Sequence, residues 1–155
     1  MLINKENGLK YHMKKLCYYF MFALLLISCG QDPEEKLQHL NGYWEIEKVE
    51  IAKDSVREYS MNGIVDYFHF DKGEGFRKKV RPQLDGKYLI TDDTEKMEAR
   101  IENDSLSLYY STPYSSWKET VLKADEDELV LENEWGKIYY YKKFTPITDI
   151  YEEEK

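Results

Sequence analysis

The chain has 155 residues, with 30 acidic and 22 basic side chains and a formal net charge of −8. An acidic surface repels phosphate groups, which argues against nucleic-acid partners. Aromatic residues make up 15% of the sequence, which is too much apolar area for a disordered chain. The length fits one domain preceded by a short leader.

An uncharged run of 12 residues, from Leu16 to Ile27, follows Met13-Lys14-Lys15 near the start of the chain. A basic start, a short apolar stretch and small residues are typical of a secretory signal peptide. As a helix the run would span about 18 Å, whereas a membrane-spanning helix needs about 20 apolar residues. We therefore predict a signal peptide over residues 1–28, with Met13 as an alternative start.

The segment Leu26-Ile27-Ser28-Cys29 resembles the lipobox of bacterial lipoproteins, in which the cysteine is acylated and becomes the first mature residue. The resemblance implies a lipid on Cys29 that anchors the chain in a membrane. Cys17 would leave with the leader, so the mature domain would have neither a disulfide nor a cysteine metal site. Gly30 and the acidic stretch 31–35 resemble the sorting signals of outer-membrane lipoproteins. We expect outer-membrane residence, with display at the cell surface as a further expectation.

Residues 29–41 form an acidic tether in which one short helix is predicted. Asp32 would cap this helix, and Leu37 and Leu40 would share one of its faces. Asn41-Gly42 would end it. The helix could lie across one end of the domain that follows, and a loosely ordered tether is the alternative interpretation.

Between residues 42 and 145, apolar and polar residues alternate with a period of two, as in strands with one wet face. Turn signals recur at short intervals. Strands are predicted over 43–51, 64–70, 75–81, 87–91, 96–102, 105–111, 117–123, 128–133 and 137–144. Eight or nine short antiparallel strands favour an all-β, up-and-down barrel, because closure removes the exposed edges. Residues 146–155 are predicted to be an acidic tail.

The sequence over roughly 40–145 resembles the lipocalin-like lipoproteins of Gram-negative bacteria. Gly42-Tyr43-Trp44 stands where lipocalins carry Gly-X-Trp, at the start of the first strand. The segments 117–121 and 129–131 resemble the later strands of these domains. The resemblance implies a lipocalin-like barrel in which Trp44 packs beneath a basic residue of the last strand. Lys142 or Lys143 could supply that charge, and Lys142 is the residue that we assign.

The sequence lacks the residue patterns of common enzymes. His39 and His69 lie far apart, and no nucleophile elbow, phosphate-binding loop or dinucleotide fingerprint occurs. The acidic groups 92–95 and 125–128 lack calcium-loop spacing, and we interpret them as solvated turns. These observations predict a protein that is not an enzyme and that has neither a cofactor nor a metal.

Two functions remain open, and the first is binding of a small apolar molecule inside the barrel. A barrel of eight strands either just holds one small ligand or is filled by its own side chains. Glu119 shares strand parity with Trp117, so it would face inward and need a partner, for which Lys142 is the candidate. Such a pair could orient a ligand or be structural. The predicted ligand-binding residues are Phe68, Phe70, Tyr88, Leu108, Tyr110, Trp117, Glu119 and Tyr140.

The second function is docking to other envelope proteins through the outer surface of a filled barrel. Exposed aromatic side chains would make the contacts. The candidates are Tyr109, Tyr110, Pro113, Tyr114, Tyr139 and Tyr141. An open pocket in the structure would favour a ligand, whereas a filled interior would favour the docking role.

Overall fold

The computed structural model describes residues 30–52, 55–59 and 63–145. The predicted leader, Cys29 and the tail 146–155 therefore lie outside the described residues. The chain separates into two units, Met1–Gly30 and Gln31–Lys155, and the second contains the fold. In the described part of the chain, no helix is both long enough and apolar enough to cross a bilayer.

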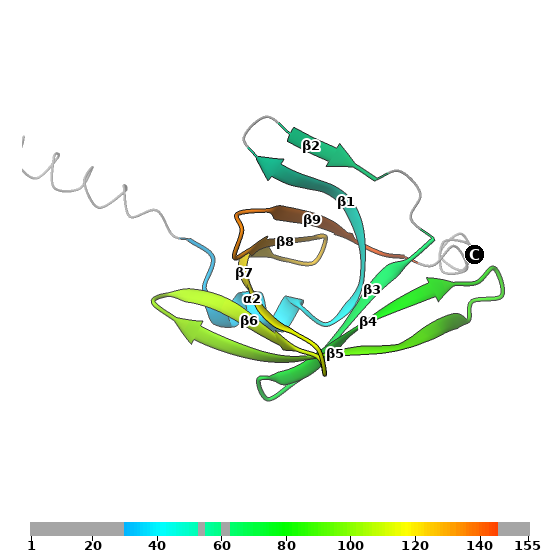
Figure 1. Ribbon diagram of the computed structural model, residues 1–155, viewed down its shortest axis with the longest axis horizontal. Coiled ribbons are helices and arrows are strands. Elements are labelled where there is room, and N and C mark those ends of the chain that lie inside the picture. The colour runs from blue at the N-terminus through cyan, green and yellow to red at the C-terminus, as the bar shows by residue number, and fades with distance from the viewer. Residues whose placement is uncertain (1–29, 53–54, 60–62, 146–155) are drawn as a thin grey trace, which may run out of the picture. The chain divides into compact units, whose positions relative to one another are not determined.

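One helix and nine strands make up the described residues (Figure 1). The helix α2 spans Pro33–His39. The strands are β1 Gly42–Ala52, β2 Ser55–Glu58, β3 Val65–Asp71, β4 Glu74–Pro82, β5 Tyr88–Glu102, β6 Ser105–Ser111, β7 Ser116–Ala124, β8 Glu128–Asn133 and β9 Ile138–Lys143.

Eight of these strands close into an antiparallel barrel. From β3 to β9 each strand pairs with the next one in the sequence, and β9 then pairs with β1. The ring closes because the start of β1, at Gly42–Trp44, pairs with β3 on its other edge. Strand β2 pairs with the far part of β1 and extends the sheet beyond the ring. The predicted all-β, up-and-down barrel is confirmed.

Two strands differ from the sequence prediction. Strand β2 was not predicted, because its four residues are all exposed and show no alternation. Strand β5 joins the segments 87–91 and 96–102, which were predicted as separate strands. The acidic group 92–95 therefore lies within a strand, and its interpretation as a turn is wrong. The reason is that β4 keeps pairing with β5 on both sides of a register shift between Lys78 and Val80.

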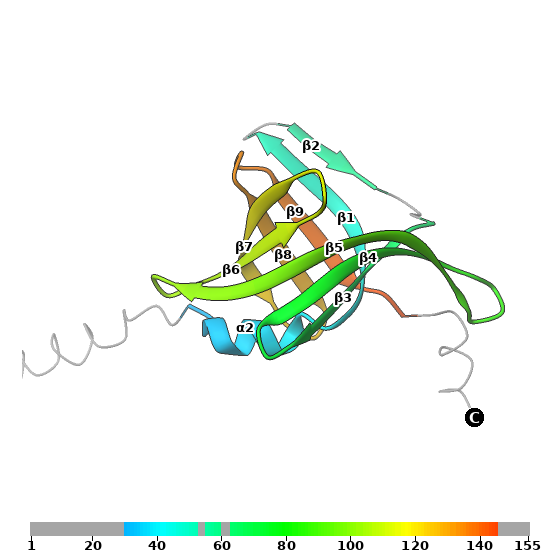
Figure 2. The same cartoon turned by 60° about the horizontal axis from the view of Figure 1, so that its bottom comes forward.

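Helix α2 lies against one end of the barrel, called the closed end below (Figure 2). The Asp32 carboxylate caps it by accepting a hydrogen bond from the backbone N–H of Glu34 at 2.9 Å. Leu40 is fully buried, and the Lys36 amine donates to the Val121 carbonyl on β7 at 3.1 Å. The predicted helix is confirmed, and the alternative of a loosely ordered segment is wrong.

Trp44 fills the closed end. Its side chain is fully buried, and its indole N–H donates to the Leu40 carbonyl at 2.9 Å. The amine of Lys143 lies 4.2 Å from the centre of the ring. Lys142, which was assigned to this place, is exposed instead and pairs with Glu45 at 3.4 Å. Because side chains alternate along a strand, only one of two successive lysines can face Trp44.

The glycine of the Gly-Tyr-Trp segment has a steric role. Gly42 has a φ of +128°, which disfavours residues with a side chain. A Cβ atom there would lie 2.6 Å from the amine of Lys143. That amine also donates to the carbonyl of Asn41 at 2.8 Å. Gly42 therefore leaves the space in which Lys143 reaches Trp44.

Candidate functional site

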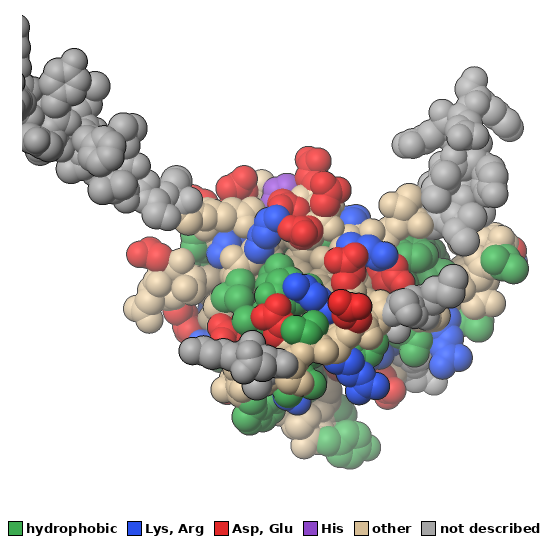
Figure 3. Space-filling model, turned by 90° about the horizontal axis from the view of Figure 1, so that it is seen from above, with side chains coloured by type: hydrophobic (Ala, Val, Ile, Leu, Met, Phe, Trp, Pro, Cys, Tyr) green, Lys and Arg blue, Asp and Glu red, His purple; other side chains and the backbone are tan. Residues whose placement is uncertain are grey.

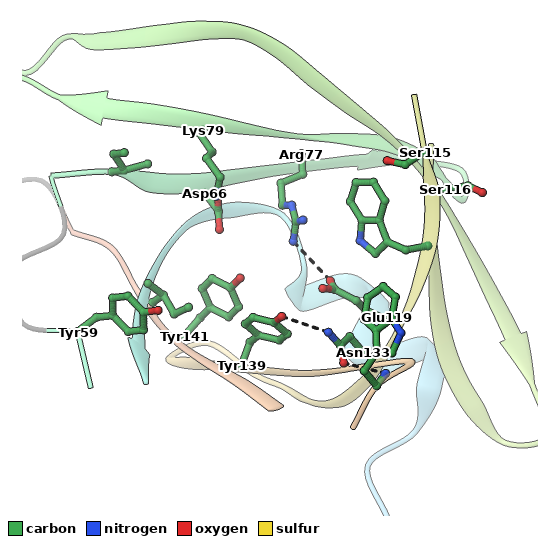
Figure 4. Close-up of a pocket in the computed structure, with 14 residues that line it drawn as sticks. Tyr59, Asp66, Arg77, Lys79, Ser115, Ser116, Glu119, Asn133, Tyr139 and Tyr141 are labelled. Carbon is green, nitrogen blue, oxygen red and sulfur yellow. Dashed lines mark hydrogen bonds and ion pairs between the residues drawn. The ribbon is translucent and has the colours of Figure 1, made fainter. Parts of the chain in front are cut away.

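A cavity of ≈ 520 Å³ occupies the part of the barrel beyond this core (Figure 4). Residues of β1, β3, β4, β7, β8 and β9 line it, together with segments that connect strands at the end opposite α2, called the open end. Several lining residues there are exposed to solvent, among them Ile64 by 38% and Trp135 by 72%. The cavity therefore reaches the surface at the open end.

Charged side chains line this cavity, although it lies inside the barrel. Arg77, Asp66 and Glu119 are buried, with exposed fractions of 8%, 6% and 5%. Arg77 and Lys79 of β4 both line the cavity; Arg77 is buried, whereas the side chain of Lys79 is 54% exposed. Asp66 of β3 is paired in register with Lys79, and its carboxylate lies 2.9 Å from that amine. The strands themselves therefore bring opposite charges together.

Arg77 lies between the filled and the hollow parts of the barrel. Its Nη1 atom is 3.4 Å from Oε2 of Glu119, and its Nε atom pairs with Glu95 of β5. On the other side, the guanidinium lies 4.5 Å from the ring centre of Tyr110 and 5.7 Å from that of Phe68. Arg77 therefore forms ion pairs with two carboxylates, and its guanidinium also packs against the rings of Tyr110 and Phe68 at the edge of the core.

Asn133 and Tyr139 form a polar wall opposite Arg77 (Figure 4). The amide of Asn133 donates to the Tyr139 hydroxyl at 3.1 Å. Its oxygen accepts from the backbone N–H groups of Trp135 and Lys137, each at 3.0 Å. These bonds fix the β8–β9 turn and, with it, the position of Trp135 at the open end.

Burial sets the ionisation behaviour of the site. It raises the pKa of Glu119, and the positive charge of Arg77 opposes this shift. Burial disfavours the charge of Arg77, but Tyr110, Tyr141 and Glu119 outweigh it, so the pKa of Arg77 is raised well above its ordinary value. The Tyr110 hydroxyl is buried without hydrogen-bonding geometry to any described group. Its pKa is raised chiefly by burial and further by Glu119.

The comparison with protein families decides the identity of this barrel. Residues 40–131, more than half of the chain, match the family described as the lipocalin-like domain. The chain belongs to this family. The match includes Trp44 and the strands that carry Asp66, Arg77 and Glu119.

Solved structures with a similar barrel include proteins from bacteria. A lipocalin-like protein from Bacteroides uniformis is 17% identical, with a TM-score of 0.44, over 68% of this chain and 99% of the other. An uncharacterized protein from Bacteroides eggerthii is 14% identical, with a TM-score of 0.43, over the same shares. Apocrustacyanin C1 is 14% identical, with a TM-score of 0.46, over 80% of this chain and 70% of its own. No curated protein matches the sequence.

The residues that were predicted to bind a ligand lie in three different parts of the lipocalin-like domain. Two of them, Trp117 and Glu119, line the cavity. Tyr88 stacks on Tyr43 at 4.5 Å, and Tyr140 lies beneath the amine of Lys48 at 4.1 Å, both on the outer face. The remaining four are buried in the core: Phe68, Phe70, Leu108 and Tyr110.

Glu119 faces inward in the lipocalin-like domain, but its partner is Arg77. The predicted pairing with Lys142 is wrong, because Tyr139 and Tyr141 are the residues of β9 that face the cavity. The same alternation overturns the prediction that Tyr139 and Tyr141 are exposed contact residues.

The other proposed contact residues also divide between the surface and the interior. Tyr110 is 2% exposed, so it belongs to the core and not to the surface. Tyr109 is half-buried and lies 4.5 Å from the guanidinium of Arg100. Pro113 is exposed, and Tyr114 is 96% exposed, so both are available at the surface.

Acidic side chains of the lipocalin-like domain pair with lysines and with backbone. Asp125 accepts from the backbone N–H groups of Asp127 and Glu128 at 2.9 and 2.7 Å, and it pairs with Lys123. The group 125–128 is thus a turn, as predicted. Among the residues with described positions, no three His, Cys, Asp or Glu side chains are grouped as a metal site would require.

Proposed function

We propose that this lipocalin-like domain binds a small molecule inside its barrel, without catalysis, and is held at the bacterial outer membrane by a lipid on Cys29. The observation that carries the binding role is the ≈ 520 Å³ cavity, because a filled barrel would have favoured the docking role. Pockets of about 300 to 1,000 Å³ hold small organic ligands. The aromatic lining suits the apolar part of such a ligand, and the charged wall suits a polar group.

Native mass spectrometry of the purified protein tests the binding role. We expect a small molecule that co-purifies and dissociates on activation. Ile46→Trp places a larger side chain in the cavity wall and should weaken retention of that molecule by about tenfold or more. Leu122→Trp adds the same side chain at an exposed position and should leave retention unchanged. Equal retention in both variants would contradict binding in the cavity.

The sequence from Met13 to Cys29 supports the lipid anchor. Cys29→Ala should abolish acylation, whereas Cys17→Ala, at the other cysteine of the chain, should leave it intact. Several acyl chains, at about 0.8 kcal/mol per buried CH₂, hold a protein stably in a bilayer. Mass spectrometry of the mature N-terminus measures the lipid. A wild-type protein without lipid would remove the basis for this part of the proposal.

Residence at the outer membrane is supported by Gly30 and by the acidic stretch 31–35. Separation of inner and outer membranes should recover the protein with the outer fraction. Protease treatment of intact cells then reports the orientation. Cleavage before lysis indicates display at the cell surface, whereas complete protection indicates the periplasmic leaflet.

A second candidate function is docking to another envelope protein through the β4–β5 hairpin. Its exposed apolar side chains favour this role, since Leu84, Leu89 and Ile90 are 93%, 60% and 63% exposed. Replacing all three by serine should abolish cross-linking to a neighbouring protein in intact cells while co-purification of a cavity ligand persists. Unchanged cross-linking would leave the hairpin without this role.

A further inference from the structure

The charges around the cavity indicate which class of ligand it accepts. We infer that the cavity prefers a small organic cation, such as an amine on an aromatic or aliphatic body, over a carboxylate of the same size. This inference rests on the proposed binding function and adds the sign of the ligand's polar group. It follows from the sharing of Arg77 between two carboxylates, from the position of Glu119 and from the aromatic lining.

Two carboxylates, Asp66 and Glu119, and two cations, Arg77 and Lys79, line the cavity. Arg77 also pairs with a third carboxylate, Glu95, which lies outside the lining. Arg77 is therefore shared by Glu95 and Glu119, and Lys79 is engaged by Asp66. An anionic ligand would have to displace one of these ion pairs, whereas a cationic ligand would lie beside a carboxylate that shares its cation.

Glu119 is the carboxylate best placed to meet a ligand. It is 5% exposed, it lines the cavity, and it projects between Arg77 and Asn133 (Figure 4). Its contact with Arg77, at 3.4 Å, is longer than the 2.7–2.9 Å typical of a strong charged hydrogen bond. Burial raises its pKa, and the positive charge of Arg77 opposes this shift. An ammonium group beside Glu119 would favour its ionised form.

Aromatic rings line the same cavity as this carboxylate and favour the same sign. Trp117, Tyr139 and Tyr141 line the cavity together with Glu119. The face of an aromatic ring attracts cations, and the attraction is stronger where water is excluded. On the outer face drawn in Figure 3, acidic and basic side chains are interspersed. The chain as a whole has a net charge of −8, so the test needs a surface variant that separates a preference of the cavity from attraction by the acidic surface.

Three probes with one phenylethyl body test the inference on the purified full chain: 2-phenylethylamine, 3-phenylpropionate and 2-phenylethanol. Ligand-observed NMR titration gives the dissociation constant of each. We expect the amine to bind at least about tenfold more tightly than the carboxylate, with the alcohol between them. Glu119→Gln should reduce this ratio to about threefold or less. Glu45→Gln removes the same charge from the outer face beside Lys142 and should leave the ratio unchanged.

The outcomes separate the inference from the proposed function. If the carboxylate or the alcohol binds as tightly as the amine, the inference is overturned and the binding role stands. A preference for the amine that persists in Glu119→Gln would also overturn the inference, because it would then originate elsewhere. If none of the three probes binds, the inference is overturned, whereas the binding role is decided by the co-purified molecule. Circular dichroism verifies the fold of Glu119→Gln, and Asp66→Asn provides a second carboxylate variant should it fail to fold.

Discussion

The two halves of the barrel share the same strands and differ in what those strands carry. At the closed end, apolar side chains fill the interior around Trp44 and under helix α2. At the open end, charged and aromatic side chains surround a cavity of ≈ 520 Å³. The closed half holds the ring together, and this leaves the open half free to keep polar groups that would weaken a core.

The change from one half to the other occurs within single strands. On β3, the buried Phe68 and Phe70 lie toward the closed end and Asp66 toward the open end. On β7, Val121 packs in the core, whereas Glu119 lines the cavity two residues earlier. One face of a strand thus serves as core along part of its length and as a binding wall along the rest.

The largest expected effect is at the closed end. Trp44→Ala removes a fully buried ring and should lower the free energy of unfolding by about 3–5 kcal/mol. Trp135→Ala removes a ring that is 72% exposed at the open end and should change it by about 0.5 kcal/mol or less. Chemical denaturation measures both. Equal effects would contradict the division of the barrel into a structural half and a binding half.

The boundary between the halves depends on Arg77. Arg77→Met leaves Glu95 and Glu119 without their cation and should cost about 3 kcal/mol, because unpaired buried charges are expensive. Adding Glu119→Leu should recover a large part of this loss, since it removes the more deeply buried carboxylate. A double variant as unstable as Arg77→Met would show that the guanidinium acts through its contacts with the core rings instead.

A smaller effect distinguishes two neighbouring lysines. Lys143→Ala loses the contact with Trp44 and the hydrogen bond to Asn41, and it should cost about 1 kcal/mol. Lys142→Ala removes an exposed pair with Glu45 and should cost less than about 0.5 kcal/mol. Thermal unfolding resolves the difference. The reverse order would restore Lys142 as the residue that covers Trp44.

The smallest effect is a pH dependence of opposite sign in the two halves. The raised pKa of Glu119 means that the folded state binds this proton more tightly than the unfolded state does. The contribution of this shift to the free energy of unfolding is complete below the ordinary carboxyl pKa of about 4.3. It is lost as pH rises through the raised pKa of Glu119. Asp125, at the closed end, has its pKa lowered to about 2 by Lys123 and by backbone N–H groups. Its stabilisation is present at higher pH and is lost as pH falls toward that value.

Two variants isolate these contributions in unfolding experiments across the acid range. The free energy of unfolding of the wild type, minus that of Glu119→Gln, should fall as pH rises from about 4, in the direction set by the raised pKa. The free energy of unfolding of the wild type, minus that of Asp125→Asn, should rise with pH over the lower part of the range. The same slope for both comparisons would contradict the assignment of Glu119 to a site whose burial raises its pKa.

Local patterns were sufficient to predict the barrel and the helix. Alternation with a period of two marks a strand wherever one face is wet, and Asp32 caps its helix by a contact within the segment itself. Strand β5 was divided in the prediction because its acidic residues resemble a turn. Only the partner strand β4 makes them part of a ladder.

The site was predicted only in part, because the alternation of apolar and polar residues does not show that its polar side chains face the inside of the barrel. On β4, the apolar Phe76 faces outward and packs at 6.0 Å against Tyr67, so hydrophobicity alone does not indicate that Arg77 faces inward. On β9, Tyr139-Tyr140-Tyr141 contains no alternation of polarity at all. Glu119 and Trp117 were predicted because β7 alternates clearly.

Closure of the ring has a consequence for how the chain folds. The contact between Lys143 and Asn41 joins residues 102 positions apart, and β9 must find β1 across the whole domain. Hairpins between neighbouring strands can form early, whereas this last seam bears the loop-closure entropy of the complete chain. The approach of Lys143 to Trp44 should therefore be among the slowest steps of folding. The fluorescence of the Trp44 indole should change when β9 pairs with β1 and the barrel closes.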